Sequence, residues 1–330
     1  MPTPLIPRLH LWEIDDQPWF PSFLRAYVQD GLTHAWTVHI PLLQPSSPAT
    51  IEAETLLRVL GPSASRYTYI DFCAGAGGPT PQVERALNSQ LSRARNKDTK
   101  DDNNNNNNNN SNENDQNENG KNDDDDDDDE NSQVDFVLTD LHPHVEAWSA
   151  ACKKSDRLTY VAQPVDAARA PDDLIRRYTE DKENNKKNGR GIFRLFNLAF
   201  HHFDDDLARA ILKNTVETSD GFGIFELQDR TPTGLLTCFA FGFFILLIAP
   251  LLYWWSPARL FWVYVIPVVP FVLVFDGLVS CLRTRTAHEV EALLRTCGAN
   301  TDGWEVKSGK EQFLWPCGYL HWIIGTKKST

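Results

Sequence analysis

Cysteine is scarce in this sequence and never closely paired. Only 6 of the 330 residues are cysteine, and no two of them form a C-x-x-C motif. The spacing therefore indicates no zinc site, and we expect no bound metal. The N-terminal stretch MPTPLIPRLHLWEIDDQ lacks a basic segment followed by an apolar one, so a cleaved signal peptide is not expected. Both absences favour a reducing, intracellular setting.

Positive charge is also in short supply. The 32 lysines and arginines face 45 aspartates and glutamates, which gives a net charge of −13. Residues 97–132 hold fourteen acids and three bases, a net charge of −11, so the rest of the chain carries only −2. No basic face is predicted, and we expect no nucleic acid among the partners.

Low complexity is confined to two segments. Residues 97–132 include eight consecutive asparagines and seven consecutive aspartates. Such a segment cannot bury apolar surface, so we expect it to be disordered. A tolerated loop insertion is favoured over an interaction tail, because polar loop tips accept insertions at little cost. The polar stretch at 179–191 is interpreted as a second loop expansion.

Short apolar runs alternate with helical patterns along most of the chain. Strands are expected at 67–72, 135–140, 158–165, 191–200 and 221–227. Helices are expected at 13–32, 50–61, 80–95, 144–154, 171–180, 205–219 and 287–298, with Asp204 or Asp205 as an N-cap. Two final strands, 303–313 and 318–326, form an antiparallel hairpin. The predicted fold is α/β, with a Rossmann-like, doubly wound, mostly parallel sheet and an antiparallel last strand.

A long apolar stretch at 234–282 interrupts this alternation. Its first part, 234–256, contains no charge and is long enough to cross a bilayer as a helix. Its second part, 260–275, is shorter, contains two prolines and stops at Asp276. We expect a membrane hairpin, with a re-entrant anchor or a helical pair that caps the domain as alternatives. Arg230, Arg283 and Arg285 flank it, which predicts that both ends face the cytosol.

The chain is therefore divided into four parts. They are an N-terminal helical segment at 1–62, an α/β core at 63–230, the apolar hairpin at 234–282, and a C-terminal helix and β-hairpin at 283–330 that complete the core.

The run YIDFCAGAGGPTP at 69–81 has the features of a ligand-binding turn. It consists of a buried strand that ends in Asp71, then very small residues, then a helix start. Glycine tolerates the positive φ that such a turn needs, and the free N–H groups of the following helix face the same ligand. A nucleotide-like cofactor is held in this way at strand–helix junctions. A tight loop in an unrelated fold is the alternative.

Polar residues follow each of the next three strands. Asp140 ends the second strand and could hold ribose hydroxyls. Asp166 follows the third strand and suits an adenine amino group, while Asn197 and His201 follow the fourth. Ligands of such folds bind at this carboxyl edge of the sheet. Suitable polar groups at the ends of four strands indicate a cofactor site more specifically than the glycine turn alone does.

This pattern resembles a class I S-adenosylmethionine-dependent methyltransferase. The resemblance rests on DFCAGAGG, the acids after the second and third strands, NLAFHH after the fourth, and the terminal hairpin, which dinucleotide dehydrogenases lack. The segments DQPWFP (16–21) and FDGLVSCLRT (275–284) further resemble a little-characterised subgroup of methyltransferase-domain proteins. The resemblance covers roughly residues 13–325, and it departs at Cys73, where the family has a glycine. We expect the turn to avoid a positive φ there.

The resemblance implies the cofactor S-adenosyl-L-methionine and a role for each residue. Asp71 fixes the methionine end, and Asn197 belongs to the same cofactor site. Asp140 takes the ribose and Asp166 the adenine. The backbone contacts are expected at Gly75, Gly77 and Gly78.

His201 is the candidate general base, with His202 second, if the acceptor must lose a proton. The alternative for both is a polar loop that caps the next helix. A metal held by these histidines and Asp204, Asp205 and Asp206 is a weaker reading, since helix capping explains the acids.

We therefore expect a methyltransferase at an intracellular membrane, with the bilayer and a lipid or apolar small molecule as partners. Two alternatives remain open: a catalytically inactive membrane scaffold, and an NAD-dependent oxidoreductase, for which a sixth parallel strand would replace the terminal hairpin. The sequence indicates no particular oligomeric state.

Overall fold

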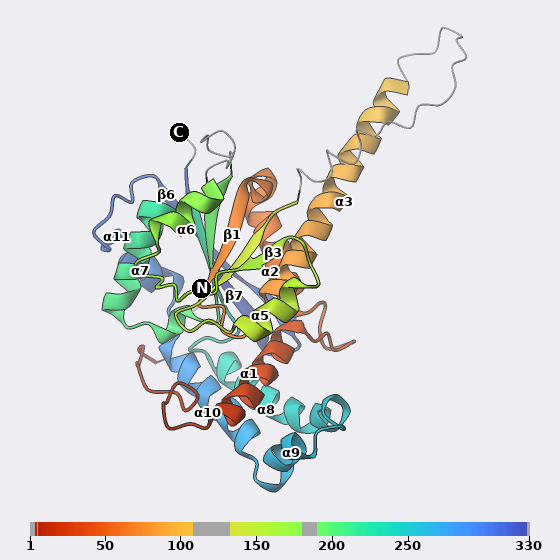
Figure 1. The fold of residues 1–330 in the computed structure, drawn as a ribbon, viewed down its shortest axis with the longest axis vertical. Helices are drawn as coiled ribbons and strands as arrows, with labels where there is room; N and C mark the ends of the chain where they lie inside the picture. The colour runs from red at the N-terminus through yellow and green to blue at the C-terminus, as the bar shows by residue number, and fades with distance from the viewer. Residues whose placement is uncertain (1–3, 5, 108–132, 180–189, 329–330) are drawn as a thin grey trace.

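A seven-stranded sheet runs through the centre of the computed structural model, which describes residues 4, 6–107, 133–179 and 190–328 (Figure 1). The strand order is β3-β2-β1-β4-β5-β7-β6. The bounds are β1 Tyr67–Phe72, β2 Phe136–Thr139, β3 Leu158–Tyr160, β4 Gly191–Asn197, β5 Gly221–Glu226, β6 Trp304–Leu314 and β7 Gly318–Lys327. Strands β1 to β5 are parallel, whereas β7 pairs antiparallel with β5 and β6. The predicted Rossmann-like sheet with an antiparallel last strand is confirmed.

Helices cover both faces of this sheet, which is why its parallel strands consist almost entirely of buried residues. One face packs against α2, α3 and α5, and the other against α6, α7 and α11. Their bounds are α2 Pro48–Leu60, α3 Thr80–Asn107, α5 Val145–Cys152, α6 Asp172–Thr179, α7 Asp205–Thr218 and α11 Ala287–Arg295. Short 3-10 turns occupy η1 (Gly61–Arg66) and η2 (Phe200–His202). Asp204 caps α7 by accepting from the Leu207 N–H, as predicted.

Several boundaries differ from those predicted. The first helix, α1, spans Ser22–Thr37 instead of beginning at residue 13, because Pro18 and Pro21 interrupt the earlier segment. Strand β4 ends at Asn197, where Leu198 takes a left-handed φ of 52°. Helix α3 continues to Asn107, since each residue added to a formed helix gains a hydrogen bond. The remainder of the 97–132 insert lies outside the described residues.

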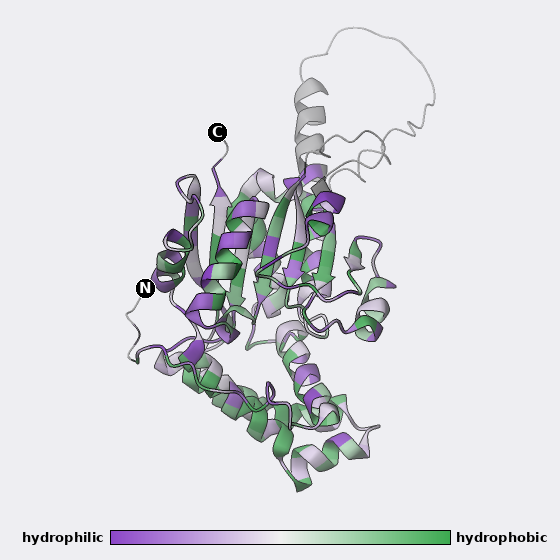
Figure 2. Ribbon diagram, turned by 60° about the vertical axis from the view of Figure 1, so that its left-hand side comes forward, coloured by the Kyte–Doolittle hydropathy of each residue, from purple (hydrophilic) through white to green (hydrophobic). Residues whose placement is uncertain are grey.

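The apolar stretch forms a helical hairpin beyond the carboxyl edge of the sheet (Figures 1 and 2). It consists of α8 (Pro232–Leu252), α9 (Pro257–Leu260), the π-helical η3 (Phe261–Val265) and α10 (Val268–Arg283). By length and composition α8 can cross a bilayer. The α9–η3 segment and α10 pass the same test only as a pair bent by 63°, a shape shared by broken spans and re-entrant loops.

Helix α8 leaves much of its apolar surface exposed. Only 28% of its most apolar window is buried inside the protein, whereas the opposite side of the hairpin packs against α1. The outward side chains are large: Leu236, Phe239, Phe243, Leu247 and Leu251. A soluble core helix would bury most of such a face.

The arginines that flank the hairpin are themselves buried. Arg230 pairs with Glu289, Arg283 with Glu13, and Arg285 with Asp205. These arginines therefore form ion pairs within the protein that connect the two ends of the hairpin to other elements. They do not present free charges to lipid headgroups.

Candidate functional site

The glycine turn between β1 and α3 is left-handed at four positions. Gly75, Gly77 and Gly78 have φ values of 51°, 112° and 48°. Cys73 has a φ of 75°, so the prediction that this position avoids a positive φ is wrong. The N–H groups of Cys73 and Ala74 both donate to the Thr139 carbonyl, at 3.1 and 3.0 Å, and this pair of bonds holds the turn against the end of β2. Burial raises the pKa of the Cys73 thiol, which keeps it protonated.

Two side chains support the turn from the β2 side. The Asp140 carboxylate accepts from the Gly75 N–H at 2.9 Å with one oxygen and from the His142 N–H at 2.8 Å with the other. The buried indole of Trp148, on α5, donates to the Gly75 carbonyl at 2.8 Å. The contribution of Trp148 was not predicted, because the sequence indicated only a helix at 144–154. Asp140 thus helps to hold the turn in its conformation.

Beneath the turn lies a buried polar group formed by Glu52, Asp71, Thr80 and Asn197. Thr80 donates its hydroxyl proton to one oxygen of Asp71, and the Asn197 amide donates to the Thr80 oxygen at 3.3 Å. Among the described residues, Asp71 Oδ1, Asn197 Oδ1 and both Glu52 carboxylate oxygens are buried without a hydrogen-bond partner. When both carboxyl groups are ionised, all four atoms are acceptors, which leaves this part of the site short of donors.

Burial governs the charge of this group. It raises the pKa of Asp71 to about 8, against the hydrogen bond from Thr80 and with a further contribution from Asp140. Burial, together with the charge of Asp71, raises the pKa of Glu52 well above its usual value. A cation placed here would reverse both shifts, because it favours the ionised carboxylates. No sequence motif indicated Glu52, because it lies in a helix predicted only from its apolar spacing.

The third acid, Asp166, lies in the exposed loop after β3. Its carboxylate accepts from the Ala168 N–H at 2.8 Å. The neighbouring Val165 N–H donates to the Asp140 carbonyl at 2.8 Å, which ties this loop to the end of β2. Asp71 is the next-to-last residue of β1, Asp140 directly follows β2, and Asp166 lies in the loop after β3. The three predicted acids therefore lie along the carboxyl ends of three adjacent strands.

His201 and His202 lie elsewhere, in η2. His201 is almost fully buried, with Nδ1 2.9 Å from Glu226 and Nε2 3.7 Å from Glu13. Burial lowers the pKa of His201 to about 3 and raises that of Glu226 to about 8. Since both ring nitrogens of His201 face carboxylates, neither is free to take a proton from an acceptor. The catalytic role of these histidines stays a prediction that this geometry does not support.

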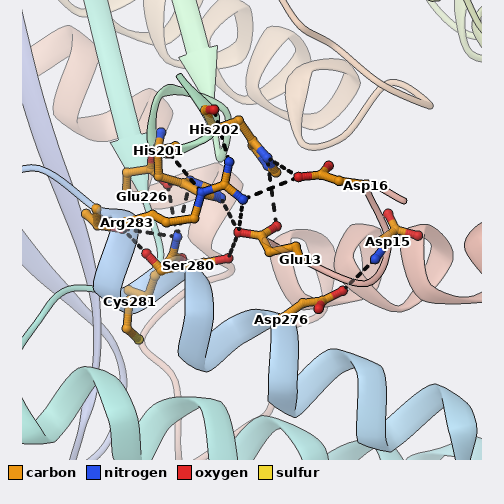
Figure 3. Close-up of polar contacts among 12 residues, drawn as sticks. Glu13, Asp15, Asp16, His201, His202, Glu226, Asp276, Ser280, Cys281 and Arg283 are labelled. Carbon is orange, nitrogen blue, oxygen red and sulfur yellow. Dashed lines mark hydrogen bonds and ion pairs between the residues drawn. The ribbon is translucent and has the colours of Figure 1, made fainter. Parts of the chain in front are cut away.

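The N-terminal segment around residues 13–21 and the segment 275–284 of α10 lie next to each other beside these histidines (Figure 3). Asp276, on α10, accepts from the N–H groups of Ile14 and Asp15 at 2.7 and 2.9 Å. Arg283 lies 3.1 Å from Glu13 and 3.3 Å from Asp16. The N-terminal segment is thereby bound along α10 and over η2.

An apolar cavity of about 120 Å³ lies between the sheet edge and the hairpin. Its walls come from α1, α8 and α10, and from Leu198 and Leu227, which follow β4 and β5. Leu198 is adjacent to Asn197 of the buried polar group. The cavity therefore begins one residue from the predicted cofactor site, on the side of the hairpin.

The chain is only distantly similar to known proteins. No family model and no curated protein matches the chain. Among solved structures, the pyocyanin biosynthetic protein PhzM is 13% identical over 85% of this chain and 56% of its own, with a TM-score of 0.40. An O-methyltransferase family protein from Burkholderia thailandensis is 12% identical over 86% and 58%, with a TM-score of 0.38. This chain thus spans little more than half of either protein.

The plantazolicin methyltransferase BamL, solved with a triazolic desmethylPZN analog and SAH, is 12% identical over 93% of this chain and 99% of its own, with a TM-score of 0.41. The strand order β3-β2-β1-β4-β5-β7-β6, with β7 antiparallel to its neighbours, defines the fold. The chain has a class I methyltransferase fold. Its antiparallel β6–β7 pair is the feature that separates this fold from the dehydrogenase arrangement.

Proposed function

We propose that the protein is an S-adenosylmethionine-dependent methyltransferase that acts on an apolar acceptor at a membrane. The observation that supports it best is the set of buried, unpartnered acceptors on Asp71, Asn197 and Glu52 beside the glycine turn. A ligand with an ammonium group would supply the missing donors and the positive charge. When bound, S-adenosylmethionine supplies that group and an electrophilic methyl on a sulfonium.

The other predicted residues fit the same ligand. A Cβ atom placed on Gly75 would meet nothing within 4 Å, so the backbone of the turn is open to close approach. Each oxygen of Asp140 accepts one backbone hydrogen bond and keeps a lone pair for a ribose hydroxyl. Asp166 is exposed after β3 and can accept from an adenine amino group.

The acceptor is proposed to occupy the apolar cavity beside Leu198. Its walls are mostly aliphatic and aromatic side chains from α1, α8 and the ends of the strands. The exposed face of α8 lies on the same hairpin, so a lipid-soluble molecule could pass from a bilayer to the cavity without crossing water. Transfer then depends mainly on positioning the acceptor in line with the methyl group.

Cofactor binding is tested by thermal unfolding with S-adenosylhomocysteine. A ligand that binds only the folded protein increases the free energy of unfolding, by about 2.7 kcal/mol when its concentration is one hundred times its Kd. The melting temperature rises as a result. We expect a rise of several degrees, largely lost in Asp140→Asn and retained in Glu146→Gln, an exposed acid on α5. No rise at millimolar ligand would contradict the proposal.

Acceptor chemistry is tested with labelled S-adenosylmethionine and a membrane lipid extract. Ala35→Phe should fill the cavity from α1 and lower transfer at least tenfold, while the melting shift with S-adenosylhomocysteine stays unchanged. Label that appears only in soluble protein would exclude a lipid acceptor but leave the cofactor site intact.

A second candidate function is a catalytically inactive membrane scaffold. It is favoured by one observation: both the N–H and the carbonyl of Gly75 already have side-chain partners, Asp140 and Trp148. A turn that is fully bonded within the protein can hold its shape without a ligand. Undetectable cofactor binding would support this function.

A further inference from the structure

Glu13, His201 and His202 bring their ligand atoms within 4.8 Å of one another. His201 Nε2 lies 3.7 Å from one oxygen of Glu13, and His202 Nδ1 lies 3.8 Å from the other. The centroids of the two imidazole rings lie 4.2 Å apart, and Figure 3 shows Glu13 beneath both histidines, with dashed lines that mark its contacts. We propose that these residues bind a divalent transition metal ion, for which Zn²⁺ is the best match.

The donor set supports this choice of metal. Two imidazoles and one carboxylate, with an open fourth position, form the ligand sets of several zinc enzymes. Ligands about 2.0–2.1 Å from a tetrahedral ion lie roughly 3.3 Å apart. The two distances to Glu13, 3.7 and 3.8 Å, would therefore shorten by about 0.4–0.5 Å, and the widest separation among the ligand atoms, at most 4.8 Å, by up to about 1.5 Å. Oxygen-only ligands would instead suit Mg²⁺ or Ca²⁺.

A second layer of contacts orients these ligands. Glu226 lies 2.9 Å from His201 Nδ1, which fixes the ring so that Nε2 faces Glu13. Ser280 donates to Glu13 Oε1 at 3.0 Å and Arg283 lies 3.1 Å from the same oxygen, so Oε2 is left to face His202. Carboxylates that hold the distal nitrogen of a ligating histidine are a regular feature of zinc sites.

The side facing solvent provides a fourth position. Asp16 lies 3.2 Å from His202 Nδ1, and both side chains are partly exposed. In the metal-free state the His202 Nδ1–H group donates to Asp16. Metal binding at Nδ1 requires the other tautomer of the neutral ring, with the proton on Nε2, and Asp16 or a water would then complete the coordination. Arg283 lies 3.1 Å from Glu13 and 3.3 Å from Asp16, and a divalent cation would add positive charge beside the same carboxylates and favour their ionised form.

The site lies outside the glycine turn, and it does not depend on the proposed methyl transfer. It joins the N-terminal segment, through Glu13, to the η2 loop that follows β4. The sequence pattern suggested a metal at these histidines only with Asp204, Asp205 and Asp206. It could not indicate Glu13, which lies 188 residues before His201 in the chain.

The test measures metal binding to the full-length protein, purified without a histidine tag and stripped with EDTA. We expect calorimetry to show about one Zn²⁺ per chain, with an affinity lowered at least 100-fold in His202→Ala. Glu226→Gln should lower the affinity by about 10–100-fold, since it removes only the orientation of His201. His288→Ala, an exposed histidine on α11, should bind like the wild type.

His202 is partly exposed, so its replacement is compatible with folding, which circular dichroism checks. The absence of stoichiometric Zn²⁺ binding, or binding unchanged by His202→Ala, would overturn the proposal and leave an ion-pair cluster. Neither result depends on whether S-adenosylhomocysteine binds, so failure of this site and failure of the proposed function are distinguishable.

Discussion

At the scale of single residues, the glycine turn carries an unusual substitution. Cys73 adopts a φ of 75°, a conformation that costs a residue with a Cβ about 1–2 kcal/mol. The sequence indicated the turn but not this strain, because the backbone angle depends on the bonds from Cys73 and Ala74 to Thr139. The strain is held in place by the surrounding strands.

We therefore expect Cys73→Gly to stabilise the protein by about 1 kcal/mol, since glycine removes the penalty. The measurement is the free energy of unfolding from urea denaturation. Ala74→Gly is the matched control: Ala74 has no positive φ, so the same change should cost about 0.5–1 kcal/mol there. Destabilisation of both variants would show that Cys73 is not strained.

Asp71 makes stability depend on pH. Its pKa rises from 3.8 to about 8 on burial, so between these values the folded protein binds a proton that the unfolded chain has lost. Stability must then fall as pH rises through this window and level off above it.

Asp71→Asn should flatten this fall in the free energy of unfolding, measured by urea denaturation at intervals from pH 5 to pH 8. Part of the slope remains, because burial raises the pKa of Glu52 as well. Glu146→Gln, on the surface, should leave the slope unchanged. An equal slope in Asp71→Asn and the wild type would refute the assignment.

At the scale of secondary-structure elements, strand β4 contains a charge in its centre. Arg194 is fully buried and donates to Ser219, to the Ala167 carbonyl and to Asn214, at 2.8, 3.1 and 2.7 Å. Its guanidinium stacks 4.3 Å over the Phe72 ring. Within the described residues no carboxylate pairs with it, and burial lowers its pKa to about 9.

Arg194→Ala should cost about 3 kcal/mol or more, because it leaves a cavity and several acceptors without donors. Arg209→Ala, an exposed arginine on α7, should change stability by about 0.5 kcal/mol or less. Chemical denaturation followed by tryptophan fluorescence gives both values. Equal stabilities would mean that the network around Arg194 contributes little.

The elements also show what sequence patterns can and cannot predict. Alternation of apolar and helical runs predicted all seven strands and the direction of the last two, since burial dictates such patterns. It could not predict where β3 and β4 end, because those points depend on contacts between distant residues such as Val165 with Asp140. Glu52, Trp148 and Glu13 entered the sites for the same reason: only the folded chain brings them there.

At the scale of the whole molecule, ion pairs of Arg230, Arg283 and Arg285 connect the ends of the hairpin to the rest of the protein. An apolar cavity lies between the hairpin and the sheet. The opposite, exposed face of α8 is proposed to contact a bilayer. A charged residue at the centre of a membrane helix costs about 2.5–3.5 kcal/mol, so a few substitutions should abolish binding.

Phe239→Glu combined with Phe243→Glu should move the protein from floated liposomes to the soluble fraction in a density gradient. Both side chains are more than half exposed, so the sheet domain should stay folded. Leu207→Glu, an equally apolar exposed position on α7, is the control and should float like the wild type. Flotation of all three proteins to the same extent would contradict membrane contact through α8.

The position of the hairpin between β5 and β7 has a consequence for synthesis. Gly221 to Glu226 of β5 pair with His321 to Thr326 of β7, and both apolar helices lie between these partners in the chain. The hairpin is therefore synthesised while β5 is still an open edge, and that edge can close only after β7 has been made. The apolar helices thus exist before the sheet that carries them is complete.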